Sequence, residues 1–276
     1  MKWIGVLMVT LLLSCPSFAQ YSGAQHSEIG LWLGTGTYFG DLNRDFSFKK
    51  TKPAIGVLYR FHYNEYVSLK AGLGMTWLAH ADSLSDNPFQ KARNLSFKTS
   101  IIEGSGQIDL HFKRFRPGDE RHAFTPYLTI GLSAFYFNPK AEFQGETYNL
   151  QALGTEGQQN SDFSGRKPYR KVQMAIPIGV GIKQWMNGNW TFFFEVSYRN
   201  ALTDYIDDVS TTYVDPFLLG DGTIAAALAD RSLEVGSVRI GEEGRQRGDS
   251  VGNDGYLMVN AGLTFVIFNR KCITPR

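Results

Sequence analysis

The stretch Tyr256-Leu257-Met258-Val259-Asn260-Ala261-Gly262-Leu263-Thr264-Phe265-Val266-Ile267 decides the fold. Every odd-numbered residue in it is apolar, whereas Asn260, Gly262 and Thr264 stand at even-numbered positions. This alternation has the period of a β-strand with one apolar face, and that face must lie against a core or against lipid. Backbone amides in lipid need partners within the fold, so strands can cross a membrane only as a closed barrel.

Earlier parts of the chain alternate in the same way. We expect strands near residues 28–40, 53–63, 67–75, 95–113, 126–137, 174–183 and 192–199. Their apolar faces should point outward, because their other faces carry charges that are costly against lipid but ordinary inside a barrel. We expect interior ion pairs among Arg60, Lys70, Glu103, Asp109, Lys183, Glu195 and Arg199. Side chains roughly fill an eight-stranded interior, which argues against a general porin.

The connections between these strands are alternately short and long. Asn64-Glu65 and Asn187-Gly188-Asn189 are short, whereas the links near residues 138–172 and 200–254 are long. In outer-membrane barrels the short turns are periplasmic and the long loops extracellular. The predicted fold is therefore an all-β, eight-stranded antiparallel transmembrane β-barrel with long extracellular loops and both termini in the periplasm. A soluble β-sandwich or lipocalin-like barrel is the alternative, but it would need a polar outer face.

The N-terminal residues resemble a secretory signal peptide. Lys2 precedes an apolar run, and Ser17-Phe18-Ala19 offers small residues before a cut at Gln20. We predict a signal peptide at residues 1–19 and a single barrel domain at 20–276, with lipoprotein processing at Cys15 as the alternative. Export of barrel strands points to the outer membrane of a Gram-negative bacterium, with its lipids as partners. The 28 basic and 26 acidic residues nearly balance, which argues against a nucleic-acid partner.

The sequence contains few residue patterns that are typical of catalytic, nucleotide-binding or metal sites. No phosphate loop, nucleotide fingerprint or metal-ligand spacing occurs in the sequence. Small barrel lipases need a Ser–His pair, and the only local collection is His80-Ala81-Asp82-Ser83. Neighbours in a loop seldom converge, so we predict no enzyme and no cofactor. Asp204, Asp207 and Asp208 are weak candidates for a calcium site, because hard cations take carboxylate oxygens; a solvated loop base is the alternative.

The long loops carry two further expectations. The Gly-rich segment at residues 236–255, with its mixed charges, is expected to be mobile. Tags inserted near Gly157 or Gly244 should be reached by protease on intact cells, because both positions fall in long loops.

Several short strings follow one another in a characteristic order. They are Tyr38-Phe39-Gly40-Asp41-Leu42-Asn43, Arg93-Asn94-Leu95-Ser96-Phe97, Thr125-Pro126-Tyr127, Phe137-Asn138-Pro139, Leu153-Gly154-Thr155-Glu156-Gly157-Gln158, Tyr198-Arg199 and Thr203-Asp204-Tyr205-Ile206-Asp207-Asp208-Val209-Ser210. Together with the barrel frame they resemble the PorG-type outer-membrane barrels of the type IX secretion system of Bacteroidota. The resemblance implies a non-enzymatic component that anchors or assembles the secretion machine through its periplasmic ring proteins.

Other functions stay open beside this one. The chain could be a general barrel for adhesion or membrane integrity, a lipid-modifying enzyme, or a narrow conduit for small ligands. The candidate residues for binding a periplasmic partner are basic, because their charge would steer an acidic partner: Arg114, Arg116, Arg121, Arg270 and Lys271. A solvated turn beside anionic head groups is the alternative interpretation of these residues.

Overall fold

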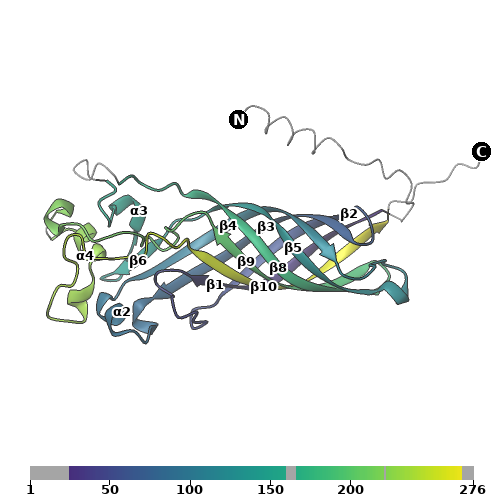
Figure 1. Ribbon diagram of the computed structural model, residues 1–276, viewed down its shortest axis with the longest axis horizontal. Coiled ribbons are helices and arrows are strands. Elements are labelled where there is room, and N and C mark those ends of the chain that lie inside the picture. Colours follow the sequence, from purple (N-terminus) through teal and green to yellow (C-terminus); the bar gives the residue numbers. More distant parts are fainter. Residues whose placement is uncertain (1–24, 160–165, 221, 269–276) are drawn as a thin grey trace, which may run out of the picture.

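Eight long strands form a closed antiparallel ring in the computed structural model, which describes residues 25–159, 166–220 and 222–268 (Figure 1). The ring strands are β1 (His26–Phe39), β2 (Lys52–His62), β3 (Val67–Ala81), β4 (Ser96–His111), β5 (Phe124–Tyr136), β8 (Val172–Asn187), β9 (Trp190–Ala201) and β10 (Gly255–Phe268). Each strand pairs with its neighbours, β1 pairs with β10, and the β3–β4 pairing completes the ring.

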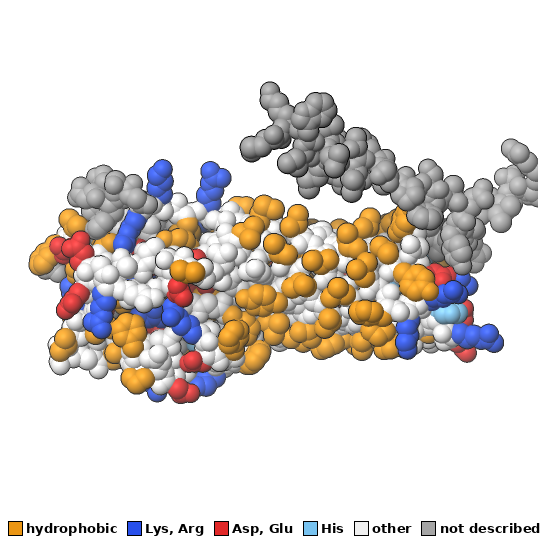
Figure 2. All heavy atoms as spheres, in the orientation of Figure 1, with side chains coloured by type: hydrophobic (Ala, Val, Ile, Leu, Met, Phe, Trp, Pro, Cys, Tyr) orange, Lys and Arg blue, Asp and Glu red, His pale blue; other side chains and the backbone are white. Residues whose placement is uncertain are grey.

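Side chains alternate between the interior and the outer wall along every ring strand, as the sequence predicts. Leu31, Leu33 and Leu73 are about two-thirds exposed on the outer wall, at 67%, 65% and 64%. Hydrophobic side chains cover the cylindrical middle of the molecule, and charged side chains gather at its two ends (Figure 2). An apolar belt of this extent is stable against lipid rather than water. The predicted eight-stranded transmembrane barrel is therefore confirmed.

The two ends of the barrel differ. Residues 63–66, 112–123 and 188–189 form short connections at one end, here named the turn end. Residues 40–51, 82–95, 137–171 and 202–254 form long connections at the other, the loop end. The long loops contain β6 (Lys140–Phe143), β7 (Glu146–Asn149), α2 (Pro88–Arg93), α3 (Leu150–Leu153), α4 (Ile224–Ala229) and three short 3-10 turns, and a fourth 3-10 turn, Glu120–His122, lies at the turn end. In the described part of the chain, no helix has both the length and the apolar character needed to cross a membrane.

The strand ends differ from the predicted ones by a few residues. Several strands are longer, because pairing continues beyond the apolar positions, whereas β4 is shorter than the predicted 95–113. For example, β5 already pairs with β8 at Phe124 and Gln184. The β6–β7 hairpin is not predicted from the sequence, since it extends only four residues in each strand, and its strand pairing with the barrel is the single pair Lys98 and Lys140. The predicted signal peptide falls on residues outside the described ranges and stays a prediction.

A phenylalanine closes the turn end from within. Residues 112–123 fold back so that the backbone N–H of Phe115 donates to Glu65 at 3.1 Å. The Phe115 ring is fully buried, lies 6.0 Å from the ring of His111, and has the Lys183 ammonium 4.3 Å from its centre. The aromatic ring therefore fills the barrel mouth above the first layer of interior charges.

Candidate functional site

The interior beside the turn end holds a network of buried charges. Glu28, fully buried, accepts hydrogen bonds from Arg60 at 3.0 Å and Lys183 at 2.8 Å. Thr264 donates to the same carboxylate at 3.1 Å. Arg60 also donates to Asp109 at 2.7 Å. Removing charges from water is costly unless each has a partner, so these pairs hold one another in place.

The network continues toward the loop end. Lys70 is paired with Glu195, which also accepts from the Tyr127 hydroxyl at 2.8 Å. Further along, Arg199 lies 3.5 Å from Glu103. The predicted pairing of the interior charges is thus confirmed. A cavity of about 30 Å³, room for one or two waters, lies among these side chains. The buried ion pairs occupy this part of the interior, which argues against a wide diffusion channel.

A serine, a histidine and a carboxylate do converge, at a place the sequence does not indicate. Ser68 Oγ lies 2.8 Å from His62 Nδ1, and His62 Nε2 lies 2.9 Å from Glu28. Ser68 Oγ is also 2.7 Å from His111 Nε2. This is the connectivity of a nucleophile, a base and an orienting acid. However, Ser68 and Glu28 have no exposed surface and His62 is 1% exposed, so an ester carbonyl cannot reach the hydroxyl in this structure.

The same place contains the one described group of three His, Cys, Asp or Glu residues whose candidate ligand atoms all lie within 4.8 Å of one another: His26, Glu28 and His62. The His26 and His62 rings are stacked, with 4.0 Å between centroids and 17° between planes. Lone pairs lie in the ring planes, so two stacked rings cannot both aim at one ion. The Lys183 ammonium lies 2.8 Å from Glu28 and 3.1 Å from His62. A lysine therefore stands where a metal would be held.

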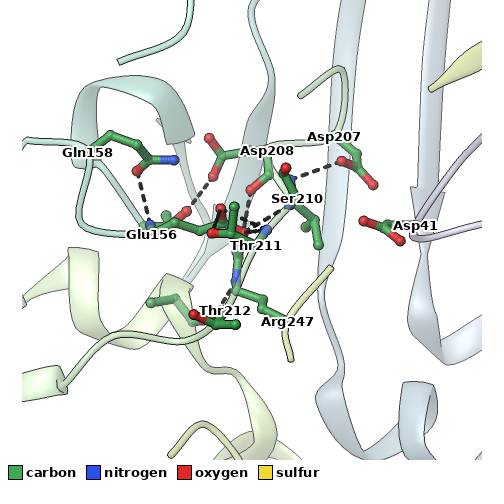
Figure 3. Close-up of polar contacts among 12 residues, drawn as sticks. Asp41, Glu156, Gln158, Asp207, Asp208, Ser210, Thr211, Thr212 and Arg247 are labelled. Atoms are coloured by element: carbon green, nitrogen blue, oxygen red, sulfur yellow. Dashed lines mark hydrogen bonds and ion pairs between the residues drawn. The ribbon is translucent and has the colours of Figure 1, made fainter. Parts of the chain in front are cut away.

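The four long loops meet at the loop end in a second buried polar cluster, here named the cap and drawn in part in Figure 3. The cap consists of Asp41, Asp82, Arg93, Glu156, Asp207, Asp208, Arg247 and Asp254, all of them buried. Arg247 donates to Glu156 at 2.9 Å, and Arg93 donates to Asp82 at 2.7 Å. Glu156 also accepts from the backbone N–H groups of Ser210 and Thr211 (Figure 3). The Arg247–Glu156 ion pair thus joins two loops that are far apart in the sequence, whereas Arg93–Asp82 lies within one loop.

Two adjacent cap carboxyls face different partners. Asp208 accepts from Thr155 at 2.5 Å and from the Tyr169 hydroxyl at 2.6 Å. Its neighbour Asp207 lies 2.6 Å from the Tyr38 hydroxyl, which is also 2.7 Å from Asp254. A phenol has one hydrogen to donate. The second short contact therefore requires a proton on one of the two carboxyls.

Burial also favours the protonated form of carboxyl groups in and beside the cap, because it raises their pKa values. It raises the pKa of Asp207 and of Asp254 well above the usual range, and Asp254 adds to the effect on Asp207. Burial raises the pKa of Asp208 to about 6, against the opposing charge of Arg247. Half-buried Asp204 has its pKa raised to about 9 by burial, with Asp41 and Asp207 adding to the shift. At neutral pH the cap therefore holds protons as well as charges.

The calcium hypothesis for Asp204, Asp207 and Asp208 stays a prediction. Among the described residues, these carboxylates do not form a group with all ligand atoms within 4.8 Å. The Asp208 oxygens are used by Thr155 and Tyr169, away from Asp207. Any cation would have to replace the protons that the cap holds.

The basic candidates at the turn end lie on an exposed surface. Arg114 and Arg116 both reach Glu65, Arg114 at 3.7 Å, and Arg114 also donates to the Tyr66 hydroxyl at 3.1 Å. Arg121 follows in the same connection and is exposed. These side chains point outward, whereas Phe115 between the first two points into the barrel. Arg270 and Lys271 lie outside the described residues, so partner binding by any of the five stays a prediction.

The cap bears on two expectations for the loops, which stay predictions. Gly157 is buried within it, so a tag there would disturb the cap rather than hang free, whereas Gly244 is exposed. Arg247, in the Gly-rich segment expected to be mobile, is 2% exposed and paired with Glu156. The composition of the segment could not indicate that Arg247 is buried and paired, because its partner Glu156 lies in another loop. Four of the quoted strings, beginning at Tyr38, Arg93, Leu153 and Thr203, do contribute residues to the cap.

The profile of a protein family described as a domain of unknown function, DUF6089, matches residues 5–217 of this chain. The chain is a member of the DUF6089 family. The match includes all ring strands except β10. Comparison of this DUF6089 member with curated proteins gives no significant match.

Solved structures similar to this DUF6089 member share little sequence with it. The attachment invasion locus protein Ail of Yersinia pestis, solved with a heparin analogue, has a TM-score of 0.43 and 7% identity, covering 88% of this chain and 99% of Ail. OprG of Pseudomonas aeruginosa has a TM-score of 0.41 and 10% identity, covering 89% and 97%. Neisserial surface protein A has a TM-score of 0.39 and 10% identity, covering 87% and 96%. The fold assignment of the DUF6089 chain rests on its own strand pairing.

Proposed function

We propose that this barrel is a non-enzymatic component of the type IX secretion system that anchors or assembles the periplasmic ring. In this proposal it lies in the outer membrane of a member of the Bacteroidota. The loop end is extracellular, and the turn end and both termini are periplasmic, because short turns of such barrels face the periplasm.

The observation that carries the proposal is the combination of a filled interior with a built cap. Buried ion pairs such as Glu28–Arg60 and Arg199–Glu103 occupy the interior that a solute would have to cross. The strings that resemble PorG-type barrels provide Asp41, Arg93, Glu156 and Asp208 to the cap, so the resemblance lies in interacting residues rather than in strand composition alone. A rigid, closed barrel suits an anchoring or assembly role better than transport.

Deletion of the gene, followed by a profile of secreted proteins, tests the proposal. We expect cargo of the type IX system to disappear from the medium and to return when the intact chain is restored. A normal secretion profile would refute the role in secretion.

A second test concerns the periplasmic surface. Replacing Arg114, Arg116 and Arg121 together by Glu should leave barrel insertion intact and weaken co-purification with the ring lipoprotein, because these three exposed cations lie on one turn. The matched control replaces two exposed arginines of the loop end, Arg239 and Arg245, by Glu. Loss of co-purification in both variants would show a general charge effect and would remove the docking surface from the proposal.

The second candidate function is a barrel for adhesion or membrane integrity, and exposed apolar side chains favour it. Phe217 and Val251 of loop 202–254 are 75% and 92% exposed at the loop end, where no lipid would cover them. Normal secretion combined with lost attachment in the deletion strain would favour this function. The burial of Ser68 argues against a lipid-modifying enzyme. If Ser68→Ala restored secretion and attachment to the deletion strain as well as the intact chain does, that result would argue further against it.

A further inference from the structure

The first long connection, residues 40–51, folds back over the outer wall of the barrel. The ladder between β1 and β2 ends at Gly36 and Lys52, so the last three residues of β1 extend beyond its neighbour. Thr37 and Phe39 stand at outward-facing positions of this overhang, yet they are only 4% and 6% exposed. The connection itself must therefore cover this part of the wall.

Aromatic contacts and one asparagine fix the returning segment. The Phe39 ring lies 5.1 Å from Phe46 and 5.7 Å from Phe48. Asn43 donates to the backbone oxygens of Tyr38 at 2.6 Å and Ser47 at 2.9 Å, and it accepts from the Ser47 N–H at 2.8 Å. The rings of Phe46 and Phe48 are thus held on the barrel through the faces that contact Phe39.

The outer faces of these rings are exposed. Phe46 is 67% and Phe48 is 59% exposed. Phe46 also has a left-handed backbone with φ 51°, a conformation that bulky residues seldom adopt because it costs energy. In water this arrangement would combine backbone strain with exposed apolar surface. Beside lipid the rings would regain the free energy of burial, and the outer wall beneath them is the lipid-facing belt.

Cationic groups stand directly beside the aromatic pair. Lys49 and Lys50 follow Phe48 and are exposed, with Lys49 Nζ donating to the Leu84 backbone oxygen at 3.0 Å. The nearby carboxylate of Asp45 accepts from the Ser85 hydroxyl at 3.0 Å, which ties the segment to the next loop. Rings at the boundary of the acyl region and ammonium groups at the phosphates are the arrangement that membrane interfaces favour.

We propose that residues 44–50 bind a phosphorylated lipid of the leaflet at the loop end. Phe46 and Phe48 pack on its acyl chains, and Lys49 and Lys50 contact its phosphates. This site is separate from the secretion role and requires only that the barrel spans a membrane.

Depth measurement tests the aromatic half of the proposal. The full chain with Cys15→Ser and Cys272→Ser is reconstituted into nanodiscs with a fluorophore at Phe46→Cys or, as the matched control, at Phe217→Cys. Phe217 is 75% exposed in the same end of the molecule but lies in a different loop. We expect a lipid-attached quencher to act on position 46 and iodide in water to act on position 217. Equal quenching by iodide at both positions would overturn the proposal.

Lipid selectivity tests the phosphate half. Nanodiscs contain phosphatidylcholine with a minor share of bisphosphorylated lipid A, and the lipid retained on the extracted protein is measured by mass spectrometry. Lys49→Gln with Lys50→Gln should reduce retained lipid A roughly 30-fold, because each of the two cations contributes about 1 kcal/mol near an anionic surface. The control, Lys91→Gln with Lys167→Gln, removes two exposed lysines from other loops and should change nothing. Equal loss in both pairs, or displacement by inorganic phosphate alone, would overturn binding of a lipid phosphate at this site.

Nanodisc incorporation is measured first for every variant. Failure of the unaltered chain to incorporate would overturn the membrane barrel itself, whereas incorporation without lipid A retention overturns only the lipid site. Neither the quenching experiment nor the lipid-retention experiment measures secretion, so the proposed function is tested separately.

Discussion

Replacing Arg247 by Met should open the cap and leave the barrel closed. The guanidinium donates to Glu156 at 2.9 Å, to the Asp208 backbone oxygen at 2.6 Å and to the Ala229 backbone oxygen at 3.1 Å. All three partners belong to loops, and Arg247 is 2% exposed. Methionine would fill much of the volume but would leave a buried carboxylate without its cation and two carbonyls without donors.

Removing one partner of a buried ion pair costs about 3–5 kcal/mol. Glu156 would keep hydrogen bonds from Ser210 and Thr211, so the lower part of this range applies. A loss of about 3 kcal/mol raises the equilibrium constant for opening by roughly 100-fold. Hydrogen exchange of the Ser210 and Thr211 amides should accelerate by that factor, because both N–H groups donate to Glu156.

The matched control is Arg245→Met, two residues earlier, where the exposed guanidinium makes one backbone hydrogen bond of 3.2 Å to Ile240. Amides of β9 and β10 should keep their protection in both variants. The double variant Glu156→Gln with Arg247→Met should be less damaged than the sum of its parts, since it removes both charges. Unchanged exchange at Ser210 and Thr211 would refute the view that this ion pair holds the cap, and lost protection in β10 would refute the independence of cap and barrel.

Four further predictions concern the interior and the loops. The pKa of Asp204 is raised from its unfolded range near 4 to about 9. Its contribution to the stability of the cap is therefore greatest below pH 4 and is lost as the pH rises toward 9. Limited proteolysis of the loops should become faster over this pH range, and Asp204→Asn should reduce that pH dependence. If the three candidate carboxylates instead bind calcium, added calcium should slow proteolysis at high pH, and chelator should reverse the effect. In the interior, Glu28→Gln would leave Arg60 and Lys183 without their shared carboxylate and should lower barrel stability by about 3–5 kcal/mol in urea unfolding, whereas Glu28→Asp should lose less. A protease site inserted at exposed Gly244 should be cut on intact cells with the cap still folded, a result that cutting only after cell lysis would contradict.

The ring strands could be predicted because their signal is local. Alternation with period two follows from strand geometry, so the outward position of Leu31 or Leu73 is readable without knowledge of the neighbouring strand. The interior ion pairs could also be predicted, because a charged side chain that cannot face lipid must face another charge inside the barrel. Choosing Glu28 as the common partner of Arg60 and Lys183 needs the register, which the sequence does not provide.

The cap could not be predicted because its contacts are not local. Asp207 and Asp208 are adjacent and suggested one shared site, yet the left-handed backbone of Asp208, with φ 67°, turns its side chain toward Thr155 and Tyr169. The Ser68–His62–Glu28 arrangement was missed for the same reason, since its members come from three strands. Pairs that meet only in the closed ring leave no periodic trace in the sequence.

The contact between Tyr38 and Asp254 has a consequence for the order of assembly. These residues are 216 positions apart, and β1 reaches the segment before β10 only once the first and last strands have paired. Loop-closure entropy makes such distant contacts late events. The cap can therefore form only on a finished barrel, and protection of its amides would report completed insertion. A chain that stalls before β10 would lack the contact between Tyr38 and Asp254 and would leave its loops open to proteolysis.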